Sequence, residues 1–305
     1  MKRLGLAIVV LGVSACGGGG DDAATSIDAA VPDATVIDGA TRDPDAASAT
    51  DGATQRDDAA SDGGSAGEPR LPPANAGFDY QLGGAYSPPD GVQIVSRDRT
   101  ESPAAGIYNL CYVNGFQAQP DASEWWLAEH PDLVLRDAGG DPVIDRDWDE
   151  MLLDTRTPEK RAALAEIVGG WIEQCADDGF DAIEIDNLDS YARSEGLLTQ
   201  DQAVAFMRLL SDVAHARGLA IAQKNSTELL ARRAEMGTDF AVAEECNRYD
   251  ECGDYVDAYG DGVLVIEYRR ADFDTGCADF PDLSIVLRDL DLVPLGTAGY
   301  VRDDC

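Results

Sequence analysis

The sequence predicts an α/β fold, a (β/α)8 TIM barrel over residues 71–305, preceded by a lipoprotein signal and a disordered tether. Eight short segments rich in Val, Ile and Leu alternate with longer segments of helical periodicity, and strands that alternate with helices form a parallel sheet. The region also has the usual length of one such barrel. An open doubly wound sheet is the alternative, but no glycine-rich phosphate loop follows the first predicted strand.

Residues 1–16 have the features of an export signal. Lys2 and Arg3 precede an apolar run over residues 4–13, and Cys16 follows small residues as in a lipobox. The run is shorter than the roughly 20 residues that span a bilayer, so it predicts a signal peptide. Two or more acyl chains on Cys16 would anchor the protein stably. We therefore expect lipid anchoring to the cell envelope, at the outer membrane or cell surface. An ordinary secretory signal with a chance cysteine is the alternative.

Residues 17–70 predict a disordered linker. They consist mainly of Asp, Ala, Gly, Ser and Thr and contain no aromatic residue. Such a segment cannot bury enough apolar surface to offset the entropy lost on ordering. We expect a solvated spacer that joins the lipid anchor to the barrel.

The predicted barrel is strongly acidic. Residues 71–305 contain 46 acidic and 18 basic side chains, which gives a net charge of −28. Such a surface repels nucleic acid and attracts a cationic polymer. Solubility or adaptation to salt is the alternative explanation. We expect a monomer that binds no nucleic acid and meets a membrane only through its lipid anchor.

Within the barrel region, strands and helices are expected in a regular order. The helix over residues 158–177 has Ala163, Ile167 and Trp171 at helical spacing, and the helix over residues 199–218 begins at a threonine cap and ends at a glycine. The predicted strands cover residues 78–82, 92–96, 107–113, 182–186, 219–224, 240–244, 263–268 and 284–288.

Six cysteines remain if Cys16 is lipidated, and an even number in an exported protein indicates disulfides. A zinc site is the alternative, but paired Cys-x-x-Cys motifs are missing and His130 and His215 are the only histidines. The expected pairs are Cys246–Cys252, which closes a short loop, Cys277–Cys305 and Cys111–Cys175.

Ionisable residues end five of the eight predicted strands, and the active site of such a barrel lies at those carboxyl ends. Glu184 and Asp186 are two residues apart and share a face, which is the lumen if the intervening isoleucines pack under the helices. Only one of Glu244 and Glu245 can face inward, and parity alone does not decide which. The other strand ends carry Gln81, Asn114, Lys224-Asn225, Glu267-Tyr268 and Arg288-Asp289.

Two carboxyl groups that converge from different strands can hydrolyse a glycosidic bond. One is protonated and assists the departing oxygen, while the other is ionised and acts as a nucleophile or activates water. Acids that are merely solvated loop residues are the alternative. Aromatic residues near strand ends suit stacking against sugar rings: Tyr80, Tyr112, Trp125, Trp126, Tyr191 and Tyr268.

Five motifs occur in consistent order from about residue 77 to residue 305: Tyr80-Gln81-Leu82, Asp154-Thr155-Arg156, residues 179–187, Gln223-Lys224-Asn225 and residues 239–246. Together they resemble glycoside hydrolase family 114, whose members are endo-α-1,4-polygalactosaminidases and related proteins with a (β/α)8 barrel. The resemblance implies that Asp186 is the nucleophile and Glu244 the acid/base. The sequence departs from the family pattern at Ile185, Ala243 and Glu245, where the family has proline, asparagine and glutamine.

We therefore expect an extracytoplasmic glycoside hydrolase that cleaves α-1,4 linkages in a galactosamine-containing, cationic polysaccharide. The resemblance implies endo action and retention, with no metal or organic cofactor. Two alternatives stay open: a non-catalytic surface carbohydrate-binding protein on the same scaffold, and a glycosidase of different sugar specificity. With the catalytic pair Asp186 and Glu244, the residues expected to bind substrate are Tyr80, Gln81, Glu184, Asn187, Asp189, Tyr191, Lys224, Asn225, Glu267 and Tyr268.

Overall fold

Eight parallel strands form the main sheet of the computed structural model, which describes residues 69–305. Each strand coincides with one of the eight segments predicted from the sequence, so the predicted barrel is confirmed. In sheet order they are β1 (Gly77–Tyr80), β2 (Val92–Asp98), β3 (Tyr108–Asn114), β7 (Ala182–Asp186), β8 (Ala220–Lys224), β9 (Phe240–Glu244), β10 (Val263–Glu267) and β11 (Ser284–Arg288).

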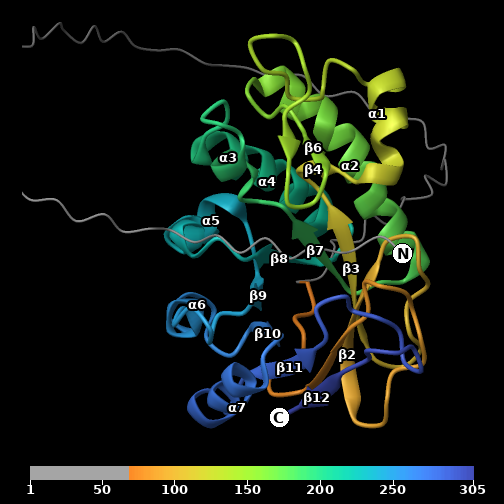
Figure 1. Ribbon diagram of the computed structural model, residues 1–305, viewed down its shortest axis with the longest axis vertical. Coiled ribbons are helices and arrows are strands. Elements are labelled where there is room, and N and C mark those ends of the chain that lie inside the picture. The colour runs from red at the N-terminus through yellow and green to blue at the C-terminus, as the bar shows by residue number, and fades with distance from the viewer. Residues whose placement is uncertain (1–68) are drawn as a thin grey trace, which may run out of the picture. The chain divides into compact units, whose positions relative to one another are not determined.

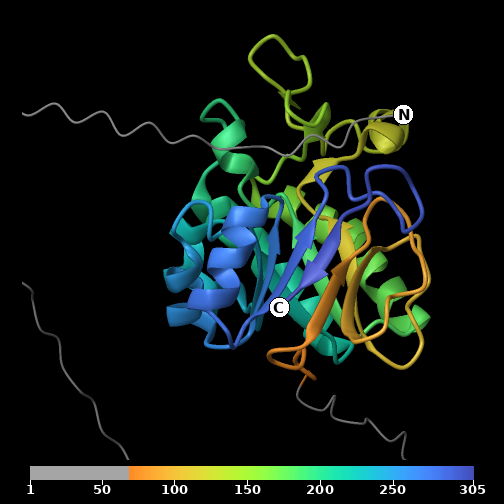
Figure 2. The ribbon, with the colours of Figure 1, turned by 60° about the horizontal axis from the view of Figure 1, so that its bottom comes forward.

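A ninth strand, β12 (Arg302–Asp304), brings the sheet close to closure. It pairs antiparallel with β11, and Arg302 Nη2 donates a hydrogen bond to the backbone oxygen of Phe78 in β1 at 3.1 Å. Figure 2 shows the first and last strands side by side, so the sheet forms a nearly closed barrel. The sequence does not predict β12, because three charged residues show no alternation of apolar and polar side chains.

Both predicted helices are confirmed, as α2 (Pro158–Asp178) and α4 (Gln200–Ala216). The Thr157 side chain accepts a hydrogen bond from the backbone N–H of Lys160, and α4 begins with a capping box formed by Thr199 and Gln202. Loops replace helices after β1 and β2. The rest of the outer layer consists of α3 (Ser190–Arg193), η2 (Thr227–Arg232), α5 (Arg233–Met236), α6 (Cys252–Tyr259) and α7 (Arg270–Asp279).

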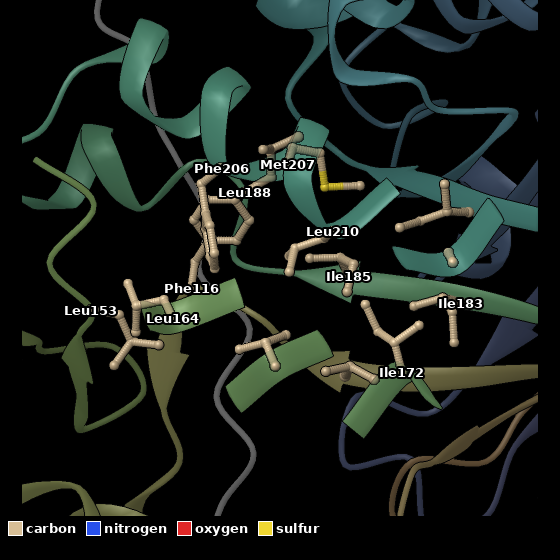
Figure 3. Packing of buried hydrophobic residues seen from close by; sticks show 14 of the residues in the cluster. Phe116, Leu153, Leu164, Ile172, Ile183, Ile185, Leu188, Phe206, Met207 and Leu210 are labelled. Carbon is tan, nitrogen blue, oxygen red and sulfur yellow. The ribbon is translucent and has the colours of Figure 1, made fainter. Parts of the chain in front are cut away.

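Successive residues of β7 face opposite sides of the sheet. Ile183 and Ile185 pack among the side chains of α2 and α4, as Figure 3 shows, while Ala182 belongs to the cluster inside the barrel. Glu184 and Asp186 have the parity of Ala182 and therefore enter the lumen, as the alternation predicts.

A segment between β3 and α2 carries a second, smaller sheet, whose strands pair antiparallel in the order β4-β6-β5. Figure 1 shows β4 and β6 beyond the carboxyl end of β3, so this insertion stands over the end of the barrel where an active site is expected. Its strands are too short to show a periodicity in the sequence. The segment comprises β4 (Gln117–Ala118), η1 (Pro120–Ala122), α1 (Ser123–Glu129), β5 (Ile144–Asp145) and β6 (Glu150–Leu152).

The predicted signal peptide with Cys16, and the predicted linker up to residue 68, lie outside the described residues. Arg70, the last residue assigned to the linker, contacts the barrel. Its guanidinium pairs with Asp181 at 2.5 Å, and its backbone oxygen accepts a hydrogen bond from the Tyr108 hydroxyl at 2.6 Å. Within residues 69–305, no helix is long and apolar enough to cross a membrane.

The three expected disulfides are confirmed. One ties β3 to α2, one bridges the loop between β9 and α6, and one ties α7 to the end of the chain. They join Cys111 to Cys175, Cys246 to Cys252 and Cys277 to Cys305.

Loss of the Cys111–Cys175 disulfide is expected to destabilise the barrel more than loss of Cys246–Cys252. All four cysteines are buried, but the bridged residues are 64 and 6 positions apart. Constraint of the unfolded chain then contributes about 4 kcal/mol for the first bridge and about 2 kcal/mol for the second. Urea unfolding of the two double Cys→Ala variants measures the difference. Equal losses would contradict the loop-length explanation.

Candidate active site

A cavity of about 330 Å³ opens at the carboxyl ends of the barrel strands, where barrel architecture places an active site. A more open depression of about 460 Å³ lies beside β2, but its lining includes no carboxyl group. The predicted site residues that line the 330 Å³ cavity are Tyr80, Asp186, Asn187, Asp189, Lys224, Asn225, Glu244 and Tyr268.

Sharp turns directly follow three of the strands that supply these residues. Asn187, Asn225 and Glu245 come after β7, β8 and β9 and have φ angles of 65°, 48° and 56°. Asparagine adopts this left-handed conformation readily, whereas glutamate does so rarely. Glu245 is held there by a hydrogen bond from its backbone N–H to Ile266 and by an ion pair with Arg248, both within 2.7 Å. These turns leave the last residue of each strand at the rim of the lumen.

Lys224 lies at the centre of the site and contacts three carboxyl groups. Its Nζ is 3.0 Å from Glu184 Oε1, 3.5 Å from Asp186 Oδ1 and 3.3 Å from Glu244 Oε2. The last two distances together limit the separation of the Asp186 and Glu244 oxygens to at most 6.8 Å. Two carboxyl groups from different strands are therefore held within reach of one glycosidic bond.

Tyrosine hydroxyls fix the orientation of these carboxyl groups. Tyr112 donates a hydrogen bond to Asp186 at 2.6 Å, Tyr80 donates one to Glu184 at 2.6 Å, and Tyr268 donates one to Glu244. Each carboxyl group thus has a hydroxyl partner in addition to the shared ammonium.

The shared ammonium sets the charge state of the site. Burial alone would raise the pKa of Asp186, but Lys224 and the Tyr112 hydroxyl outweigh burial and hold that pKa below its usual value. Burial likewise opposes a charged Lys224, yet the surrounding carboxylates raise its pKa well above the usual value. Asp186 is therefore ionised and Lys224 is protonated at neutral pH.

Four residues predicted to bind substrate do not line the cavity. Glu184 lies beneath it, fully buried against Lys224. Gln81 is also buried and hydrogen bonds to Asp79 and Arg97. The Tyr191 hydroxyl donates a hydrogen bond to Glu228 outside the cavity. Glu267 faces the helix layer instead of the lumen.

Of the two tryptophans expected to offer a platform for sugar rings, Trp126 is fully buried and cannot do so. Trp125 is 41% exposed and packs edge-on against Trp126, and neither lines the cavity, so a platform at Trp125 stays a prediction. The tryptophan in the cavity wall is Trp148, which belongs to the inserted segment.

Sequence reasoning missed several lining residues because they come from outside the strand ends. Glu150 is supplied by β6 of the insertion, and Arg193 by the short helix α3. Arg193 pairs with Asp145 at 2.6 Å and with Asp189 at 2.7 Å, so it links the insertion to the loop after β7. Its spacing of four residues from Asp189 is the one signal in the sequence that could have suggested this contact. The remaining missed residues include Asp98 and Asp121.

Glu267 lies on the opposite side of the barrel wall from the site, because it has the parity of Val265, which packs outward. Its Oε1 accepts hydrogen bonds from the backbone and side chain of Asn247, whereas its Oε2 is buried without a partner among the described residues. Cys246 and Cys252 lie close enough to share a metal with Glu267. Their disulfide, however, leaves no free thiolate as a ligand.

Replacement of Glu267 by glutamine is expected to stabilise the protein above neutral pH. Burial raises the pKa of Glu267 to about 7, so the folded state retains a proton that the unfolded chain releases at lower pH. The stability that protonated Glu267 contributes is therefore fully present at acid pH and is lost as pH rises through 7. Glutamine cannot ionise. The free energy of unfolding of the variant, relative to that of wild type, should therefore rise by on the order of 3 kcal/mol between pH 5 and pH 8. Urea unfolding tests this, with exposed Glu124→Gln as the control. A difference independent of pH would contradict it.

A barrel whose cavity at the strand ends holds two carboxyl groups from different strands within reach of one glycosidic bond has the features of a glycosidase. The model of glycoside-hydrolase family GH114 matches residues 59–305. The chain therefore belongs to family GH114 and is a glycosidase. Comparison of the sequence with curated proteins finds no significant match.

Solved structures share the fold. Aspergillus fumigatus Ega3 in complex with galactosamine aligns with a TM-score of 0.61 and 22% identity, over 79% of this chain and 100% of that chain. A variant of the glycoside hydrolase domain of PelA from Pseudomonas aeruginosa aligns with a TM-score of 0.50 and 15% identity, over 74% of this chain and 99% of that chain. At these identities the likeness extends to the barrel and its order of elements.

Proposed function

We propose that this glycosidase cleaves α-1,4 linkages within a galactosamine-containing polysaccharide with retention of configuration. The observation that carries the proposal is the contact of Asp186 and Glu244 with one lysine, which keeps their nearest oxygens within 6.8 Å. Retention needs carboxyl groups about 5 to 5.5 Å apart, whereas inversion needs about 6.5 to 9.5 Å. The retaining separation lies within the observed limit on the nearest oxygens.

Asp186 is the proposed nucleophile. Its low pKa, caused by Lys224 and Tyr112 against the effect of burial, supplies the ionised oxygen that must attack the anomeric carbon. The attack forms a glycosyl ester on Asp186 and breaks the bond to the departing sugar oxygen.

Glu244 is the proposed acid/base. It would give a proton to the departing oxygen in the first step, then take a proton from the water that hydrolyses the ester. Tyr268 and the Asn225 amide hold this carboxyl group, and Asn225 also accepts a hydrogen bond from the Glu244 backbone. These contacts hold the Glu244 carboxyl group at the end of β9, beside the Lys224 ammonium that it shares with Asp186.

Charge supports a cationic substrate. The cavity is lined by six acidic and two basic side chains, and the surrounding barrel is also acidic. A galactosamine polymer with free amines is positively charged and would be attracted to such a surface. The similarity of fold to Ega3, solved with galactosamine, agrees with this substrate class.

The proposed location is the outer face of the cell envelope, through a lipid on Cys16. The lipobox sequence and the three disulfides support export. Cys16→Ser is expected to move the protein from the membrane fraction to the soluble fraction, because the acyl chains provide its stable attachment. Fractionation of cells expressing each form measures this. Retention of the variant in membranes would contradict lipid anchoring.

Release of reducing ends from partly deacetylated α-1,4-galactosaminogalactan by the chain from residue 17 tests the proposed activity. A rapid fall in viscosity with few reducing ends released would indicate endo action. Nuclear magnetic resonance of the first product would give its anomeric configuration. Binding without cleavage would instead indicate a carbohydrate-binding protein.

A further inference from the structure

Glu150 has no role in the proposed reaction, yet it lines the cavity. It is 8% exposed and reaches the site from β6 of the inserted sheet. Its Oε2 accepts hydrogen bonds from Asn114 Nδ2 at 2.8 Å and Asn187 Nδ2 at 3.3 Å. Within residues 69–305, no donor contacts its Oε1 and no cation pairs with it. One oxygen is therefore fixed by the protein and the other is available to a ligand.

The nearby cations are already engaged by other carboxyl groups. Lys224 contacts Glu184, Asp186 and Glu244, and Arg193 pairs with Asp145 and Asp189. A buried carboxylate without a countercharge is costly, so a ligand cation that supplied one would bind favourably.

The position of Glu150 suggests which part of a sugar it would meet. Its partner Asn187 directly follows Asp186, so Glu150 stands beside the nucleophile rather than beside Glu244. If Asp186 attacks the anomeric carbon of a bound sugar, a carboxyl group at this place would face a substituent of the same sugar ring.

We infer that Glu150 recognises the ammonium group of a galactosamine unit bound next to Asp186, and so selects units with a free amine. The inference rests on the proposed function, which it refines by assigning the preference for free amines to one residue. A carboxylate that meets an ammonium forms a charge-assisted hydrogen bond, which an N-acetyl group cannot replace.

The protonation of Glu150 supports this role. Burial and the charges of Asp186 and Asp145 raise its pKa to about 7, against the effects of the Asn114 amide and Arg193. An ammonium bound to Oε1 would favour the ionised form, so binding would release a proton at mildly acid pH. Affinity for a free-amine sugar should therefore weaken as pH falls below 7.

Binding to a protein that cannot turn over tests the inference. Calorimetry on Glu244→Gln would compare an α-1,4-linked galactosamine oligosaccharide with its N-acetylated form, with and without Glu150→Gln. We expect Glu150→Gln to weaken binding of the free-amine form by about 10- to 100-fold at pH 7.5, and to change binding of the N-acetylated form by less than about twofold. Asp147→Asn, an exposed acid of the same insertion, is the matched control and should change neither.

The outcomes separate the inference from the function on which it rests. If Glu150→Gln weakened binding of both oligosaccharides equally, or of neither, the role of Glu150 would be overturned but the proposed substrate class would not. Failure of the Glu244→Gln protein to bind the free-amine oligosaccharide at all would overturn both. The calorimetric stoichiometry gives the fraction of folded protein, so misfolding of Glu150→Gln cannot imitate a loss of affinity.

Discussion

Asp186→Asn is expected to lower kcat on the polysaccharide by about 10⁴-fold or more, because an amide cannot form the glycosyl ester. Asparagine keeps an oxygen that can accept the hydrogen bond from Tyr112, so the shape of the site should be preserved. Reducing-end assays at saturating substrate measure kcat. Asp212→Asn, which removes an exposed carboxylate from α4, controls for loss of charge and should retain full activity.

Glu244→Gln separates the two proposed roles. Loss of an acid/base group costs about 10²- to 10⁴-fold, and a substrate with a good leaving group needs no proton in the first step. Activity of Glu244→Gln on an activated aryl glycoside should therefore recover and increase with added azide, while Asp186→Asn should stay inactive on both substrates. The reverse pattern would exchange the roles, and equal recovery would contradict the pairing.

The barrel was predictable because its strands obey simple rules. Each of the eight strands contains apolar residues, and in β7 the alternation puts Glu184 on the face opposite Ile183. That face is the lumen because Ile183 packs under the helices, as the prediction from the sequence assumed. The inserted sheet and β12 follow no such rule, since their strands have two or three residues and depend on contacts with distant segments.

The candidate site was predictable only where it lies on the barrel strands or in the loops that directly follow them. Asp186, Lys224 and Glu244 each end a strand and reach the cavity as expected. Glu267 also ends a strand, but it lies on the outer face of the sheet, whereas the next residue, Tyr268, faces the lumen. The rule that strand ends carry the site does not distinguish these two residues. Glu150 could not be assigned, because the position of the insertion is set by tertiary contacts such as that with Asn114.

Lys224→Met is expected to lower both stability and activity, because it leaves three carboxyl groups without their common countercharge. Breaking a buried ion pair by removing one partner costs about 3 to 5 kcal/mol. The pKa of Asp186 should rise once the ammonium is gone, so the variant should lose stability as pH rises and recover part of it at pH 5. Urea unfolding at pH 5 and pH 8 measures this, and a loss independent of pH would contradict the electrostatic explanation.

Two further variants identify what Lys224 contributes to catalysis. Lys160 pairs with buried Asp154 at 2.5 Å outside the cavity, so Lys160→Met should cost stability without lowering kcat. The double variant Lys224→Met/Glu184→Gln removes one positive and one negative charge together and should regain stability relative to Lys224→Met. If kcat stays low in that stable protein, Glu184 serves to balance the lysine, and the lysine serves to keep Asp186 ionised. If kcat recovers as well, the lysine is needed only for folding and the low pKa of Asp186 must have another cause.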